Sequence, residues 1–166
     1  MNIVLIGYRG TGKSVVGRIL AERLNKTYVG MDAEIVRRAG MSIPEIVEKS
    51  GWPGFRDLET RVAFEMADRD DLIIDTGGGV IERADNIAAL SKNGKIFWLT
   101  AEVATIVQRI QGDDQRPALT RGKSFTEEVA DVLEKRTAKY QSAANHTIAT
   151  DTLTPEQVAE AVMRRI

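Results

Sequence analysis

The sequence predicts an α/β fold in which helices cover both faces of a parallel sheet. Short apolar, β-branched runs alternate with longer stretches of helical periodicity, as in sheets built from strand–helix units. Residues 2–6, 71–75 and 95–100 are apolar almost throughout, which is typical of strands buried on both faces. The glycine-rich stretch GYRGTGKS at 7–14 directly follows the first of these runs. Together these observations favour one P-loop domain over residues 1–166.

The individual elements follow from the same patterns. The expected strands are 2–6, 27–29, 71–75, 95–100 and 146–150. The first helix follows the glycine-rich stretch, because apolar residues recur there on one face at helical spacing. These residues are Val15, Val16, Ile19, Leu20 and Leu24. Further helical stretches run about 33–39, 55–68, 83–91, 101–111, 126–144 and 155–166.

Two helix starts carry a capping signal. Ser42 and Glu45 have the spacing of a capping box, in which each residue's side chain bonds the other's backbone N–H. Thr154 and Gln157 repeat this spacing, and Pro155 stands at the first helical position, where proline is favoured. We therefore expect helices to begin directly after Ser42 and Thr154.

The segment GDDQRPALTRGKS at 112–124 has no predicted element. It is charged, and glycine and proline interrupt it. Stretches of this length without secondary structure in a compact domain are usually functional loops or disordered segments. We expect 112–124 to be a mobile lid that carries Arg116 toward the functional site.

The composition excludes several classes of protein. The chain has 166 residues, 43% of them hydrophobic, and a formal net charge of −1, so no basic face for nucleic acid or a membrane surface is expected. Cysteine is absent and His146 is the only histidine, which excludes thiolate and multi-histidine zinc sites. No apolar run approaches the roughly 20 residues that span a bilayer. We expect a cytoplasmic protein without nucleic-acid or membrane partners, and a monomer by default.

The stretch 7–14 matches the phosphate-binding pattern G-x-x-x-x-G-K-[ST] and stands between a strand and a helix. Its glycines allow successive backbone N–H groups to point inward, so that these groups and the helix N-terminus form an anion site. Lys13 can reach the β- and γ-phosphates of a nucleoside triphosphate, and Ser14 can ligate Mg²⁺. The predicted nucleotide-binding residues of this loop are Gly10, Thr11, Gly12, Lys13, Ser14 and Val15.

The same loop allows two other interpretations. One is a glycine-rich turn with a surface lysine. The other is a dinucleotide-binding loop, because Asp32 lies 20 residues past Gly12, where an acid that binds a ribose would stand. Counted from Gly10, however, Val15 occupies the place of the third glycine, and a G-K-S triplet serves triphosphates.

The rest of the chain indicates what accepts the phosphate. The guanine-reading pattern N-K-x-D and the protein-kinase signatures H-R-D and D-F-G are absent. Instead, arginines stand in GFRDLE (Arg56), DQRPAL (Arg116) and KRTAKY (Arg136). Any one of them could be a solvated charge, but Glu59, three residues past Arg56 on a helix, is placed to hold its guanidinium.

The run TGGG at 76–79 follows the third predicted strand. Ligands of parallel sheets bind beyond the carboxyl ends of the strands. Gly77, Gly78 and Gly79 are therefore expected near the P-loop, with backbone N–H groups available to an anion or a substrate.

In this order, the motifs resemble those of the shikimate kinase family over essentially the whole chain. The matching pieces are GYRGTGKS, Asp32, GMSIPEI, GFRDLE, TGGG, RPAL and RTAKY. The resemblance implies a nucleoside-monophosphate-kinase-like fold with a five-stranded parallel sheet flanked by helices, a substrate-binding region at 33–60 and a mobile lid. It also implies transfer of the ATP γ-phosphate to the 3-hydroxyl of shikimate, with Mg²⁺ as cofactor.

The resemblance also implies roles for individual residues. Asp32 would contact substrate hydroxyls as the candidate base, and Arg56 and Arg136 would bind the substrate carboxylate. Gly77, Gly78 and Gly79 would line the site between shikimate and the γ-phosphate. The implied catalytic residues are Lys13, Asp32 and Arg116, of which Arg116 would neutralise developing charge from the lid. Arg109 and the turn at 150–152 would lie close to the adenine.

One departure from the family's pattern concerns the metal. The family usually shows D-x-D at the end of the second strand, and alignment on GMSI places Gly30 at the first aspartate and Asp32 at the second. The first of these carboxylates is associated with the Mg²⁺ shell. Asp75, at the end of the third strand, is the candidate to take over this role beside Ser14, because both strands end at one edge of the sheet. Alternatively, Asp75 only orders the glycine loop.

Other departures leave the substrate open. Gly51–Trp52 stands where the family commonly has Gly-Glu, and Ala118 replaces a leucine after Arg-Pro. A kinase for another small hydroxy acid, such as a gluconate-type substrate, is one alternative function. A nucleotide-binding regulatory paralogue without turnover, suggested by Gly30, is the other.

Overall fold

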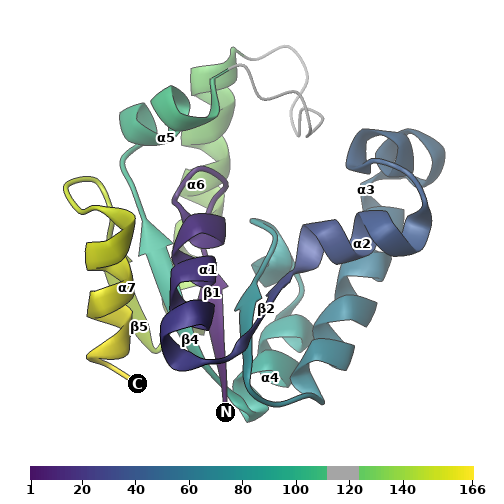
Figure 1. Ribbon diagram of the computed structural model, residues 1–166. Helices are drawn as coiled ribbons and strands as arrows, with labels where there is room; N and C mark the ends of the chain where they lie inside the picture. Colours follow the sequence, from purple (N-terminus) through teal and green to yellow (C-terminus); the bar gives the residue numbers. More distant parts are fainter. Residues whose placement is uncertain (112–123) are drawn as a thin grey trace.

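Five parallel strands form the central sheet of this computed structural model, which describes residues 1–111 and 124–166 (Figure 1). Their order across the sheet is β2-β3-β1-β4-β5. The strands are β1 (Asn2–Ile6), β2 (Thr27–Gly30), β3 (Leu72–Asp75), β4 (Gly94–Thr100) and β5 (His146–Ala149). The predicted α/β class and parallel sheet are confirmed.

Helices connect the strands and cover the sheet. They are α1 (Lys13–Leu24), α2 (Met31–Ala39), α3 (Ile43–Ala67), α4 (Ala84–Lys92), α5 (Val103–Ile110), α6 (Phe125–Ala143) and α7 (Pro155–Met163), with a short 3₁₀ helix η1 (Val80–Glu82). Both predicted capping boxes are present, at the starts of α3 and α7. The predicted elements therefore recur in order, with boundaries shifted by a few residues at most of their ends.

The longest helix differs from its sequence expectation. The sequence predicts a helix start directly after Ser42 and a separate helical stretch over about 55–68, whereas one helix, α3, runs from Ile43 through both. Its path is kinked at Gly51, where φ is 69° and ψ is 175°, and helical geometry resumes at once. Gly51 and Pro53 both disfavour a continuous helix. The sequence therefore indicates a break between two helical stretches, whereas the structure has a kink within one helix.

The two faces of the sheet carry separate apolar clusters. On one face, Ile3 and Leu5 pack with residues of α1 and α7. On the other face, Val4 and Ile6 pack with residues of α2, α3 and α4. These four side chains of β1 are all fully buried, because alternate residues of a strand point to opposite faces and both faces are covered. The glycine-rich loop that follows β1 is thereby held on a rigid strand.

The carboxyl edge of the sheet gathers the predicted motifs. Asp75 is the last residue of β3, and its register partners are Leu5 of β1 on one side and Gly30 of β2 on the other. The P-loop, the start of α2 and the TGGG run all leave the sheet at this edge. In the part of the chain that the structure describes, no helix has both the length and the apolarity needed to cross a membrane.

Candidate active site

The P-loop adopts the backbone conformation that its glycines permit. Gly10 and Gly12 have φ of 83° and 93°, a left-handed region that glycine enters without steric penalty. Helix α1 begins at Lys13, immediately behind Gly12, so the unpaired N–H groups of its first turn face the loop. The ammonium of Lys13 donates to the carbonyl oxygens of Gly7 (2.7 Å) and Tyr8 (3.0 Å). The lysine is therefore folded across the loop, at the position where phosphates would bind.

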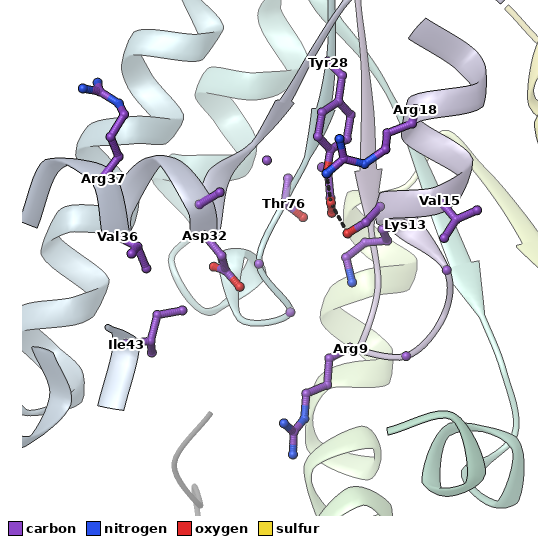
Figure 2. Close-up of a pocket in the computed structure, with 18 of the residues that line it drawn as sticks. Arg9, Lys13, Val15, Arg18, Tyr28, Asp32, Val36, Arg37, Ile43 and Thr76 are labelled. Atoms are coloured by element: carbon purple, nitrogen blue, oxygen red, sulfur yellow. Dashed lines mark hydrogen bonds between the residues drawn. The ribbon is translucent and has the colours of Figure 1, made fainter. Parts of the chain in front are cut away.

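A cavity of about 730 Å³ opens in front of this loop. Figure 2 shows Lys13 and Asp32 reaching into it from opposite sides, one from α1 and the other from the first turn of α2. The expected site residues that line it are Gly10, Gly12, Lys13, Ser14, Val15, Asp32, Asp75, Gly77 and Gly78. The structure thus brings the P-loop, the start of α2 and the glycine run together around one space.

Arg56 lies at the back of the glycine run and does not line the cavity. Its guanidinium donates to Glu59 across 2.9 Å, and Glu59 is fully buried. The same guanidinium lies 5.3 Å from the ring centroids of both Trp52 and Phe55. The predicted contact between Arg56 and Glu59 is therefore present, and the two rings restrict the guanidinium further.

Arg136 approaches the same loop from α6. It is buried, and its Nε lies 3.7 Å from a carboxylate oxygen of Glu82 in η1. A β-carbon added at Gly78 would lie 3.6 Å from Nη1 of Arg136. The two arginines from α3 and α6 therefore converge on neighbouring glycines.

Gly79 makes room for the Arg56 guanidinium, which gives a testable consequence. A β-carbon at this position would overlap that guanidinium, whereas the backbone, with φ of −97°, accepts any residue. We expect Gly79→Ala to displace the flexible end of Arg56 without unfolding the chain. If Arg56 holds the acceptor, the acceptor KM rises about tenfold or more while the KM for ATP changes little. The melting temperature should fall, because the displaced guanidinium no longer pairs with the buried Glu59. An unchanged acceptor KM would show that Arg56 does not bind the acceptor.

Tyr140 anchors the glycine run from below, a role that the sequence did not reveal. Its hydroxyl donates to the carbonyl oxygen of Gly78, and its ring stacks on Trp98 at a centroid distance of 5.6 Å. Burial raises the pKa of Tyr140 to about 12, despite the opposing effect of Arg136. The phenol is therefore protonated at neutral pH and remains a donor to the loop.

Arg109 joins the P-loop to the turn after β5. Its guanidinium donates to the carbonyl oxygen of Gly10 (3.1 Å) and to the hydroxyl and carbonyl oxygens of Thr150 (3.1 and 3.3 Å). Arg109 and the turn at 150–152, both of which the family resemblance implies to lie near an adenine, are thus in contact.

A hydrogen-bonded set occupies the metal side of the P-loop. The Oδ2 atom of Asp75 accepts from the hydroxyl of Ser14 (2.6 Å) and from the hydroxyl of Tyr28 (2.7 Å), as the dashed lines in Figure 2 mark. Burial, and then the Asp75 carboxylate, raise the pKa of Tyr28 to about 12. The expected proximity of Ser14 and Asp75 is present, whereas Tyr28 was not expected to take part.

Comparison with known proteins agrees with these motifs. The family model described as shikimate kinase matches residues 9–166. A shikimate kinase of Sulfurihydrogenibium sp. is 36% identical over 165 residues, covering 99% of this chain and 97% of the relative. The chain belongs to the shikimate kinase family.

Further members of the shikimate kinase family support this assignment. One from Nitratidesulfovibrio vulgaris is 40% identical over 152 residues, covering 90% of this chain and 86% of the relative. The solved structure of shikimate kinase from Acinetobacter baumannii in complex with shikimate has a TM-score of 0.94 at 36% identity, covering 99% of this chain and 91% of that one. The structure from Aquifex aeolicus has a TM-score of 0.85 at 29% identity, covering 99% and 95%.

Some predicted features of this family member stay predictions. Arg116, Ala118 and almost all of the segment 112–124 lie outside the described residues. The site residues that sequence reasoning missed are Arg9, Arg18 and Tyr28, which line the cavity, and Tyr140. A signal for Tyr28 was available, because it stands two residues before Gly30 on one strand and so shares its face.

Proposed function

We propose that this protein transfers the γ-phosphate of ATP to the 3-hydroxyl of shikimate. The observation that carries the proposal is one cavity whose lining includes Lys13 and Ser14 of the P-loop, Asp32 on the opposite side, and Gly77 and Gly78 of the glycine run. Two guanidinium groups behind that run suit an acceptor with a carboxylate. The solved relative from Acinetobacter baumannii, which is in complex with shikimate, supports the same acceptor.

In the proposed reaction, the 3-hydroxyl oxygen attacks the γ-phosphorus. A bond forms between these two atoms, the bond from the γ-phosphorus to the bridging oxygen breaks, and ADP leaves. Asp32 takes the hydroxyl proton, and Arg56 and Arg136 hold the acceptor carboxylate. Lys13 and the backbone N–H groups of the P-loop stabilise negative charge on the transferred group. Arg116 is proposed to add positive charge from the segment 112–124.

We further propose Mg²⁺ as the cofactor. Within residues 1–111 and 124–166, no cluster of three acidic or histidine side chains forms a ready-made metal site. The hydroxyl of Ser14 and the carboxylate of Asp75 are oxygen donors of the kind that Mg²⁺ prefers when nucleotide phosphates and waters complete its shell. These two residues would hold the ion, which supplies charge neutralisation on the phosphates.

A coupled ADP-release assay tests the proposed function. The purified enzyme with ATP and Mg²⁺ is expected to release ADP in proportion to added shikimate and to form shikimate 3-phosphate. Gluconate and other small hydroxy acids serve as comparison acceptors. Preferred turnover of one of those acids would replace shikimate, and nucleotide binding without turnover of any acid would indicate a regulatory paralogue.

We also propose that the enzyme is a cytoplasmic monomer that binds ATP and one small acid. The formal net charge of −1 supports the absence of a nucleic-acid or membrane-surface partner. Light scattering coupled to size exclusion is expected to give the mass of one chain, about 18.3 kDa. A mass of twice this value would show a dimer.

A further inference from the structure

We propose that Tyr28 and Asp75 act as one unit that positions Ser14 for Mg²⁺-bound nucleotide, in place of a carboxylate at Gly30. The inference rests on the proposed kinase function and deepens it. It assigns a positioning role to Tyr28, which contacts Asp75 and lies on a different strand.

The hydrogen bonds at Asp75 show which residue orients which. Ser14 and Tyr28 both donate to the same carboxylate oxygen, Oδ2, at 2.6 and 2.7 Å. The Ser14 hydroxyl hydrogen is therefore directed at Asp75, so the lone pairs of its oxygen are left for a cation. Neither bond requires the second carboxylate oxygen. Asp75 is 8% exposed; its carboxylate thus orients the P-loop hydroxyl, and Tyr28 orients the carboxylate.

Gly30 makes space for the Tyr28 hydroxyl. Tyr28 and Gly30 stand on the same face of β2, and a β-carbon at Gly30 would lie 3.2 Å from the Tyr28 hydroxyl oxygen and 3.7 Å from two ring carbons. Such a contact is tighter than an ordinary van der Waals approach, and a carboxylate would extend beyond it. The missing side chain at Gly30 and the phenol of Tyr28 are therefore structurally linked.

Helix α1 holds the ring of Tyr28 from the other side. The guanidinium of Arg18 lies 4.5 Å from the ring centroid, a distance typical of a cation–π contact. A β-carbon at Gly17 would lie only 2.9 Å from the ring, so this glycine of α1 also accommodates the phenol. Tyr28 is thus fixed against the helix that begins with Lys13 and Ser14, which connects β2 to the phosphate-binding turn.

The test is the Mg²⁺ dependence of ADP binding, measured by calorimetry with Mg²⁺ and with EDTA. Tyr28→Phe removes one hydroxyl and keeps the ring. We expect the gain in ADP affinity on adding Mg²⁺ to fall about tenfold in Tyr28→Phe, and up to about 100-fold in Asp75→Asn. Binding in EDTA and the melting temperature of Tyr28→Phe should remain close to those of the wild type. Ser91→Ala is the control, because it removes a hydroxyl on α4 that donates to the carbonyl oxygen of Ala88, outside the site, and should leave the Mg²⁺ gain unchanged.

A swap experiment tests the link to Gly30. Asp75→Asn with Gly30→Asp should recover part of the Mg²⁺ gain, and adding Tyr28→Phe to that pair should recover more, because the clashing hydroxyl is then absent. An Mg²⁺ gain within about twofold of wild type in both Tyr28→Phe and Asp75→Asn would overturn the proposal. ADP binding needs no acceptor. A wild-type enzyme that fails to phosphorylate shikimate would therefore contradict the proposed function, but the Mg²⁺ dependence of ADP binding would still test the role of Tyr28 and Asp75.

Discussion

Lys13→Ala is expected to abolish measurable turnover while the protein remains folded. Lys13 is 7% exposed, and its ammonium lies across the P-loop with hydrogen bonds to two loop carbonyl oxygens. In the reaction it would move to the β- and γ-phosphates, where charge develops on the transferred group. Removing one preorganised donor to developing charge costs about 10²- to 10³-fold in kcat, and a full positive charge should cost at least the upper value.

The control for this variant is Lys92→Ala, which removes the exposed lysine at the end of α4. It should retain wild-type kcat and KM. Melting curves of Lys13→Ala show whether the loss of the two loop hydrogen bonds has unfolded the chain. A folded Lys13→Ala enzyme with kcat within twofold of wild type would refute the assignment of this loop as the phosphate site.

Arg136→Ala is expected to raise the KM for shikimate tens-fold or more, with little change in the KM for ATP. Truncating one partner of a buried charge pair costs roughly 2–5 kcal/mol, and Arg136 is 6% exposed beside Gly78. Steady-state kinetics with each substrate varied in turn measure the two constants. Arg164→Ala, at the exposed end of α7, is the matched control with unchanged kinetics. A raised KM for ATP with a constant KM for shikimate would place Arg136 in the nucleotide site.

Arg56→Ala should raise the same acceptor KM, but its interpretation needs a second variant. Truncating Arg56 leaves the fully buried Glu59 without its guanidinium, which is itself destabilising. Arg56→Ala combined with Glu59→Gln removes that unbalanced charge. The double variant should melt at a higher temperature than Arg56→Ala while keeping the raised KM, which separates the effect on stability from the effect on acceptor binding.

The parts of the site that were predictable are those written within short stretches of sequence. The P-loop pattern, the TGGG run and the capping boxes each occupy a few consecutive residues, so their local geometry follows from residue type. The contact of Arg56 with Glu59 was also predictable, because three residues along a helix bring side chains together.

The remaining features depend on contacts between residues far apart in the chain. Tyr28 and Asp75 are 47 residues apart, and Tyr140 and Gly78 are 62 apart. Tyr28 meets Asp75 because β2 lies beside β3, and Tyr140 meets Gly78 because α6 packs over the glycine run. Neither arrangement leaves a periodic pattern in the sequence. The same holds for Arg56 and Arg136, whose motifs marked them as unusual without showing that they lie behind the glycines.

The place of β3 in the sheet also has a consequence for how the enzyme reaches its active form. β3 lies between β2 and β1, although both of those strands precede it in the chain. Both β1 and β2 form hydrogen bonds with β3. During synthesis, neither strand can therefore pair with β3 until residues 72–75 have emerged. Ser14 and Asp75, 61 residues apart, come together in that same event, which closes a long loop and is correspondingly slow. In refolding experiments, recovery of Mg²⁺-dependent nucleotide binding should therefore coincide with insertion of this strand, and should lag behind the formation of helices.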